Sequence, residues 1–258
     1  MTIFTDRQAA ITDLKARIPR VDVLESQVGC MSDSEVFLKL RAAEAEVSRR
    51  LRLPLEPTLV LNEDDTTEAE IAALPPGTAF RLEPGYDYAP NFFQQNSWGY
   101  LVTRQRPIIE LQSYRFVYAD SRGSSYEVPR EWFRIDKKYG HVRLLPTGST
   151  SLLPLNAYLL SVFSGGSSIP NAIRLRYTAG VRDLQNTHPD LYDFILRVSL
   201  LLLIRSSFPG GSGSISADGL SGSESFDIKA YTDAANGSIE GEYKRWTDFF
   251  HGVRMVIA

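Results

Sequence analysis

The feature that most constrains the fold is an apolar segment in the second half of the chain, which contains the run Val198–Ile204 with Ser199 as its only polar residue. Pro189 lies where a proline is tolerated in the first turn of a helix. A helix that is apolar on nearly every face must be covered by other elements. Because Arg197 and Arg205 flank the run, and because a membrane span needs about 20 apolar residues, we expect a buried core helix and no membrane partner.

Two further helices are predicted near the N-terminus. A short amphipathic helix over 5–17 is closed by Pro19. Ser32 and Glu35 fit the capping-box pattern, in which a hydroxyl and a carboxylate satisfy backbone N–H groups reciprocally, and the helix that follows runs to about Leu53. The apolar residues at helical spacing are Ile11, Leu14 and Ile18 in the first helix and Val36, Leu40, Ala43, Val47 and Leu51 in the second.

The C-terminal region combines a loop with a last helix. Residues 209–225 are rich in glycine and serine, which predicts a long loop that is flexible or depends on a partner for its order. A helix is predicted over 226–253, where aromatic residues including Trp246 recur. Gly237 and Gly241 each weaken this helix by about 1 kcal/mol relative to alanine, so it needs neighbours.

Between about 78 and 180, aromatic and β-branched runs are broken by glycine, proline and serine, which is typical of short strands. The predicted strands are Phe80–Leu82, Tyr100–Arg104, Ile108–Tyr118, Tyr126–Val128, Phe133–Asp136, His141–Leu145, Ala157–Phe163 and Ala172–Thr178. The alternating segment Trp132–Pro146 is predicted to form a hairpin. We therefore expect an α+β fold, in which a helical domain formed by 1–55 and 181–258 carries an inserted antiparallel β domain at 56–180.

Charge and cysteine content narrow the function classes. A net charge of -3 argues against a dedicated nucleic-acid binder, which would show a basic patch. Cys30 is the single cysteine, so an intramolecular disulfide framework and a multi-cysteine zinc site are excluded and folding in the cytosol is expected. Cys30 itself is predicted to be a small buried side chain. The first 18 residues lack the apolar run of a signal peptide, so export by that route is not expected.

No catalytic, cofactor or metal residue is predicted. The glycine-rich loop lacks the lysine of a phosphate-binding loop, and no Gly-x-Ser-x-Gly elbow occurs. His141, His188 and His251 are far apart in sequence, and each is expected to be either exposed or hydrogen-bonded within the fold. The sequence does not exclude a pair of catalytic carboxylates that come together only in the fold. A carbohydrate-active enzyme would require such a pair.

The most acidic stretch, 56–70, is the one candidate for a calcium site. It lacks the glycine and the regular aspartate spacing of a calcium-binding loop. Thr66 or Thr67, followed by glutamates, is typical of a helix start, so we expect a short helix that ends at Leu74 rather than a metal site.

An aromatic-rich stretch supplies the candidate contact residues Tyr86, Tyr88, Phe92, Phe93 and Trp98. Aromatic side chains form stacking platforms for sugars or single-stranded nucleic acid. They are also enriched in cores and at protein contacts. We expect these residues to serve in the core or at an interface with another subunit or a partner.

Two segments resemble head-to-tail connector proteins of tailed bacteriophages, also called neck adaptors or head-completion proteins. Val36–Leu51, VFLKLRAAEAEVSRRL, is similar to the second helix of that family. Ile173–Phe208, IRLRYTAGVRDLQNTHPDLYDFILRVSLLLLIRSSF, is similar to the family's strand ending in Tyr-x-Ala-Gly, with its short loop, proline and long apolar helix. The stretch between the two segments departs from the family pattern.

The resemblance implies a structural virion protein without enzymatic activity or cofactor. It would be a connector-type helical bundle whose copies form a ring, commonly of twelve, at the neck of the virion after synthesis in the host cytoplasm. Implied partners are further copies, the portal protein, a tail-side neck or terminator protein, and double-stranded DNA that passes transiently through the channel. The family often contacts the portal through its C-terminal segment, here Arg254, Met255, Val256, Ile257 and Ala258. A tail-completion or baseplate subunit is the alternative.

Overall fold

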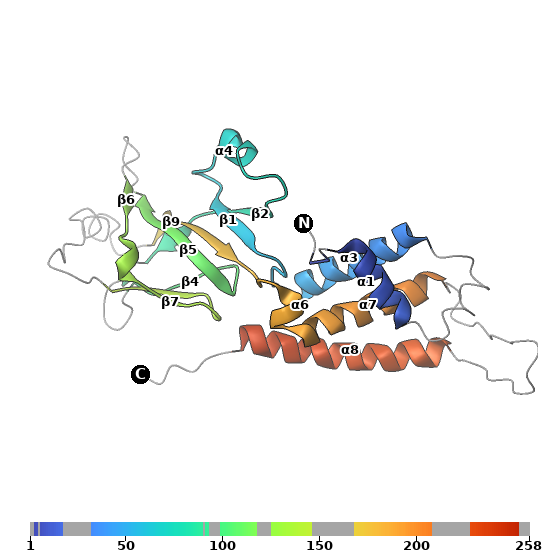
Figure 1. The fold of residues 1–258 in the computed structure, drawn as a ribbon. Helices are drawn as coiled ribbons and strands as arrows, with labels where there is room; N and C mark the ends of the chain where they lie inside the picture. Colours follow the sequence, from blue (N-terminus) through green and yellow to red (C-terminus); the bar gives the residue numbers. More distant parts are fainter. Residues whose placement is uncertain are drawn as a thin grey trace, which may run out of the picture. The chain divides into compact units, whose positions relative to one another are not determined.

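The computed structural model describes residues 3–4, 6–17, 32–89, 91–92, 99–117, 125–145, 168–207 and 228–252 (Figure 1). The described residues form two compact units. The sheet unit lies within Leu53–Arg182, and the helical unit lies within Thr2–Arg52 and Asp183–Ala258. Strands and long helices are thus segregated along the chain, and the expected α+β class is confirmed.

The helical unit is built around one buried helix. Its elements are α1 (Arg7–Ala16), α3 (Asp33–Leu51), α6 (Leu184–Thr187), α7 (Pro189–Ser207) and α8 (Ile228–His251). Helix α7 packs against α1, α3, α6 and α8, and Leu191, Phe194 and Ile195 are fully buried. The expectation of a core helix is therefore confirmed.

Local sequence sets the ends of α3. The Ser32 hydroxyl accepts a hydrogen bond from the backbone N–H of Glu35 at 3.2 Å, which satisfies one of the free donors in the first turn. The helix stops at Leu51, because Arg52 adopts a left-handed conformation with φ of 49°. The helix therefore ends two residues before the predicted end at about Leu53.

The described residues of the sheet unit form two sheets and one short α-helix. Its elements are β1 (Thr58–Asn62), α4 (Glu68–Ala72), β2 (Phe80–Glu83), β3 (Tyr86–Tyr88), β4 (Leu101–Val102), β5 (Ile108–Val117), β6 (Ser125–Glu127), a 3-10 turn (Arg130–Trp132), β7 (Phe133–Asp136), β8 (His141–Leu144) and β9 (Ile169–Ala179). The first sheet has the order β2-β1-β9-β5-β6, with β3 also paired to β9, and the second has the order β4-β8-β7.

The first sheet is mixed, which corrects the expectation of an antiparallel domain. β1 and β2 are parallel, with Leu59 opposite Phe80, while the other pairs in the sheet are antiparallel. Parallel neighbours need a crossover connection. The segment that carries α4 provides it, and it begins with a complete capping box between Thr67 and Glu70.

The core of the sheet unit is formed by side chains from both sheets. Along β9 the residues alternate, so that Ile173 and Tyr177 are fully buried while Arg174 and Arg176 point to the opposite face. The predicted hairpin is present as β7 and β8, with Ile135 opposite Val142. The predicted strand Ala157–Phe163, the glycine- and serine-rich loop at 209–225 and Cys30 lie outside the described residues.

Candidate functional site

The aromatic residues selected from the sequence lie in the core of the sheet unit where the structure describes them. Tyr86, Tyr88 and Phe92 are 9%, 4% and 5% exposed. Tyr88 and Phe92 both pack against the ring of Phe116, at centroid distances of 6.1 and 6.2 Å. Of the two roles expected for this stretch, these three side chains serve in the core. Phe93 and Trp98 lie outside the described residues, as do Arg254, Met255, Val256, Ile257 and Ala258.

A buried carboxylate lies beside these aromatic rings. Glu83, at the end of β2, is 5% exposed. Its Oε1 accepts a hydrogen bond from Nε2 of Gln105 at 2.7 Å, and its Oε2 accepts one from the hydroxyl of Tyr177 at 3.1 Å. A buried carboxylate is stable only when such donors surround it. Glu83 therefore joins β2, β9 and the loop after β4.

Two tyrosine hydroxyls complete this network. The backbone N–H of Arg104 donates to the hydroxyl of Tyr86 at 2.9 Å, and that of Gln105 donates to the hydroxyl of Tyr177 at 3.2 Å. Burial raises the pKa of both hydroxyls, so both stay protonated at neutral pH. The guanidinium of Arg104 lies 4.1 Å from the Tyr86 ring centroid and donates to the carbonyl of Gly85. The network holds a loop in place and presents no free nucleophile.

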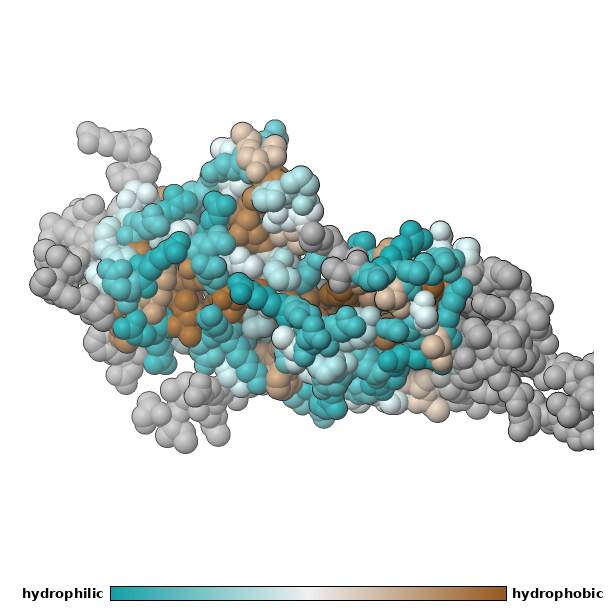
Figure 2. Space-filling model, viewed as in Figure 1, coloured by the Kyte–Doolittle hydropathy of each residue, from teal (hydrophilic) through white to brown (hydrophobic). Residues whose placement is uncertain are grey.

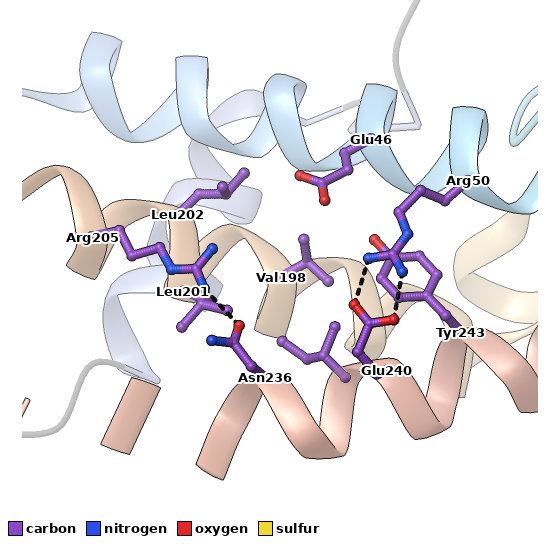
Figure 3. Close-up of a pocket in the computed structure, with 10 residues that line it drawn as sticks. Glu46, Arg50, Val198, Leu201, Leu202, Arg205, Asn236, Glu240 and Tyr243 are labelled. Atoms are coloured by element: carbon purple, nitrogen blue, oxygen red, sulfur yellow. Dashed lines mark hydrogen bonds and ion pairs between the residues drawn. The ribbon is translucent and has the colours of Figure 1, made fainter. Parts of the chain in front are cut away.

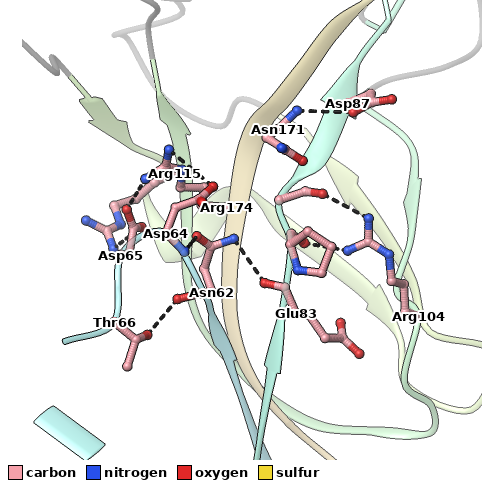
Figure 4. A network of polar contacts seen from close by, with 12 residues as sticks. Asn62, Asp64, Asp65, Thr66, Glu83, Asp87, Arg104, Arg115, Asn171 and Arg174 are labelled. Atoms are coloured by element: carbon pink, nitrogen blue, oxygen red, sulfur yellow. Dashed lines mark hydrogen bonds and ion pairs between the residues drawn. The ribbon is translucent and has the colours of Figure 1, made fainter. Parts of the chain in front are cut away.

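Figure 4 shows how arginines use the carboxylates of the acidic segment. Oδ2 of Asp65 accepts from Nη2 of Arg115 at 2.7 Å, and Oδ1 of the same carboxylate pairs with Arg174. Asp64 lies 3.5 Å from Arg174. Asn62 orders the turn, because its side-chain oxygen accepts from the backbone N–H of Asp64. These ion pairs tie the turn after β1 to β5 and β9.

The histidines take separate places. The His141 ring lies 5.2 Å from that of Tyr100 in the sheet unit. His188 contacts the Phe250 ring at 5.7 Å in the helical unit, where His251 also lies 2.5 Å from the carbonyl oxygen of Leu51. Within the described ranges, no group of three acidic, histidine or cysteine side chains could hold a metal ion.

An open cavity of about 260 Å³ lies in the helical unit among α3, α7 and α8 (Figure 3). Its apolar wall includes Val198 and Leu201, and the Glu46 carboxylate points into it. At its rim, Nη1 and Nη2 of Arg50 donate to Glu240 at 2.8 and 2.6 Å, and this hydrogen bonding lowers the pKa of the Glu240 carboxyl below its ordinary value. The polar groups of the cavity rim thus pair with one another across α3 and α8, and these pairs hold the helices together.

The least expected surface is the open edge of the larger sheet. Strand β2 is at one end of the strand order and β6 is at the other. Phe80 and Leu82, both on β2, are 43% and 41% exposed. Figure 2 shows apolar surface below α4, where Figure 1 places β1 and β2. Sequence reasoning predicted the strand, but the position of β2 at an edge depends on the pairing of distant segments.

Comparisons with known proteins give limited similarity. No protein-family model and no curated protein sequence matches the chain. A chain from the neck of an empty GTA particle, computed with C6 symmetry, aligns with a TM-score of 0.38 and 14% identity, and covers 94% of this chain and 93% of that chain. A chain from the virion of a native gene transfer agent (GTA) particle gives 0.37 and 13%, with the same coverage. At TM-scores below 0.5, neither fold nor function follows from the likeness. In the part of the chain that the structure describes, every helix is too short or too polar to cross a membrane.

Proposed function

We propose that the chain is a structural virion protein, a head-to-tail connector that forms an oligomeric ring between the portal and the tail. The observation that carries the proposal is the packing of α3 against α7. These helices contain Val36–Leu51 and the helical part of the segment Ile173–Phe208, the two stretches that resemble the connector family. Segments far apart in sequence thus form one helical unit, which is what a connector bundle interrupted by an inserted domain requires.

The ion pairs of this unit support a role in cohesion. Arg197 on α7 donates through Nη2 to Oε2 of Glu242 on α8 at 2.9 Å, and through Nε to Asp193 at 3.0 Å. Tyr243 on α8 packs at 4.9 Å from the ring of Phe194. These contacts fix α8 along α7 and give each copy a defined surface, which a ring of identical subunits needs for its repeated heterologous interface.

The proposed partners follow from the same function. They are further copies in a ring of twelve, the portal protein, a tail-side neck or terminator protein, and double-stranded DNA in transit. The net charge of -3 suits a channel that passes DNA without holding it. We propose Arg254–Ala258, which follows α8 in the sequence, as the portal contact, because a basic residue is followed there by four apolar ones.

The test is electron microscopy and mass measurement of the purified chain, alone and with its cognate portal. Rings of about twelve copies that stack on the portal are the expected result. Replacement of Arg254–Ala258 by glycine and serine should abolish stacking and leave the ring intact. A monomer that ignores the portal would contradict the proposal, and a ring that binds a tail tube or baseplate instead would favour the alternative virion role.

A further inference from the structure

Among the described residues, no strand pairs with the outer side of β2, and part of the β2 backbone directs its hydrogen-bonding groups to that side. The N–H of Leu59 donates to the carbonyl of Ala79, and that of Glu63 donates to the carbonyl of Glu83. In a parallel pair, alternate residues of a strand form the backbone hydrogen bonds. The backbone N–H and C=O groups of Ala79, Arg81 and Glu83 therefore point toward β1. Phe80 and Leu82 therefore point their N–H and C=O groups away from the sheet, and they are also the residues of β2 with exposed apolar side chains.

On the other edge strand, β6, alternate residues also point their backbone groups out of the sheet. The N–H of Val128 donates to the carbonyl of Tyr114. In the antiparallel β5–β6 pair, the backbone groups of Tyr126 thus point toward β5, and those of Ser125 and Glu127 point away from the sheet. Strand order makes β6 antiparallel to β2, because β1 and β5 are both antiparallel to β9.

Side-chain directions agree as well. Phe80 and Leu82 share a face of the sheet with Leu59, which is opposite Thr178 and so turned away from the buried Tyr177. Glu127 is opposite Arg115 on that same outer face, while Tyr126 is opposite the buried Phe116. Side chains of residues directly opposite each other on neighbouring strands lie on the same face of a sheet. On both edge strands, the residues whose backbone groups point out of the edge therefore have their side chains on the outer face of the sheet. The two edges can pair without turning any side chain to the wrong face.

We propose that β2 of one copy pairs with β6 of a second copy and joins the two sheets. The register that uses all three residues of β6 places Phe80 opposite Glu127, Arg81 opposite Tyr126, and Leu82 opposite Ser125. The Arg81 guanidinium would then lie near the half-buried ring of Tyr126, an arrangement that favours a cation–π contact. An extended strand added to an exposed edge is an established mode of association.

Self-pairing of β2 is less favourable. The register that pairs Phe80 with Leu82 in both directions places Arg81 opposite the Arg81 of the second copy, and like charges directly opposite each other destabilise a sheet. The β2–β6 contact uses two different surfaces of each copy, so it repeats from copy to copy. The inference rests on the proposed function, since it names the interface of the ring.

Disulfide cross-linking tests the register. In a Cys30→Ser background, Arg81→Cys and Tyr126→Cys would place two thiols at a non-hydrogen-bonded pair, where Cα atoms are about 4.5 Å apart. Oxidation of the assembled full-length chain should give a ladder of covalent oligomers for the double variant and monomers for each single variant. Leu82→Cys with Tyr126→Cys is the matched control, because its thiols lie on opposite faces and should not react.

A proline variant provides a second measurement. Leu82→Pro removes an N–H that faces the open edge and spares the hydrogen bonds to β1. It should abolish the ring in mass measurement, while circular dichroism shows a folded chain. Intact rings of Leu82→Pro, or rings whose double-cysteine variant stays uncross-linked, would overturn the edge pairing and leave the connector proposal standing. Dimers from Arg81→Cys alone would assign self-pairing instead. A ladder without closed rings would support the pairing and contradict the ring.

Discussion

Two buried tyrosines on neighbouring strands should respond in opposite ways to the same substitution. Tyr114 on β5 and Tyr177 on β9 are both 0% exposed. Within the described part of the chain, the Tyr114 hydroxyl has no hydrogen-bond partner, whereas that of Tyr177 donates to Glu83 and accepts from the N–H of Gln105. Replacement by phenylalanine removes one oxygen in each case, so the difference in stability reports the hydrogen bonds.

The magnitudes follow from the cost of a buried polar group without a partner, about 1–3 kcal/mol, and from the roughly 1.5–3 kcal/mol of a hydrogen bond to a charged group. Tyr114→Phe should raise the free energy of unfolding by about 1–2 kcal/mol. Tyr177→Phe should lower it by about 3 kcal/mol, because it removes a donor from Glu83 and leaves the Gln105 N–H without an acceptor.

Urea unfolding measures both changes. Circular dichroism follows the whole chain, and Trp132, which is 4% exposed, provides a fluorescence probe within the sheet unit. The midpoint should shift while the dependence on urea stays constant, so that the shift reports stability. A lower midpoint for Tyr114→Phe, or an unchanged midpoint for Tyr177→Phe, would contradict these hydrogen-bond roles.

Three further predictions concern glycines, pH and an ion pair. Gly180→Ala should lower the free energy of unfolding, measured by thermal unfolding, by about 3 kcal/mol or more, because φ is +114° and a Cβ would collide with the Glu56 carbonyl. Gly237→Ala should instead stabilise α8 by about 0.5–1 kcal/mol, because the space around Gly237 is open. Burial raises the pKa of Tyr243 to about 12, so its contribution is complete below pH 10 and declines by up to about 1.4 kcal/mol per pH unit between about 10 and 12. In a pH series of urea unfolding, Tyr243→Phe should make the slope shallower by this share, while the share of other buried tyrosines such as Tyr177 persists. Asp65→Asn should lower the urea midpoint by the equivalent of about 1–2 kcal/mol, because it replaces the carboxylate shared by Arg115 and Arg174 with a neutral acceptor and leaves Arg174 with Asp64 as its charged partner. Asp87→Asn, on the same unit, is the control.

Helices were the most predictable part of the fold. The period of apolar residues predicted α3, and the nearly all-apolar stretch after Pro189 predicted α7, because each helix carries its own pattern in its local sequence. β1 was missed, since the acidic residues that follow it dominated the interpretation of 56–70. β3 was missed as well. It pairs with β9 over a few residues only, so its existence depends on a distant strand rather than on a pattern of its own.

The buried network could not be predicted for a related reason. Glu83 and Tyr177 are far apart in sequence, and nothing in the local sequence indicates that a glutamate at the end of a short strand is enclosed. Glutamate is mostly exposed in proteins, so the default expectation is a solvated side chain. Only the mixed topology, which places β2 beside β1 and β1 beside β9, brings the carboxylate and the two hydroxyls of the network together.

Strand β2 departs from the local rule in the opposite sense. The order Phe80, Arg81, Leu82, Glu83 predicts a strand whose apolar residues are inside and whose charges are outside. The structure has Phe80 and Leu82 exposed and Glu83 buried. Such a conflict between pattern and placement is expected where a sequence serves something besides its own folding. Since Glu83 is satisfied by Gln105 and Tyr177, the inversion is stable within one copy, and it leaves two apolar residues at the edge where another strand can cover them.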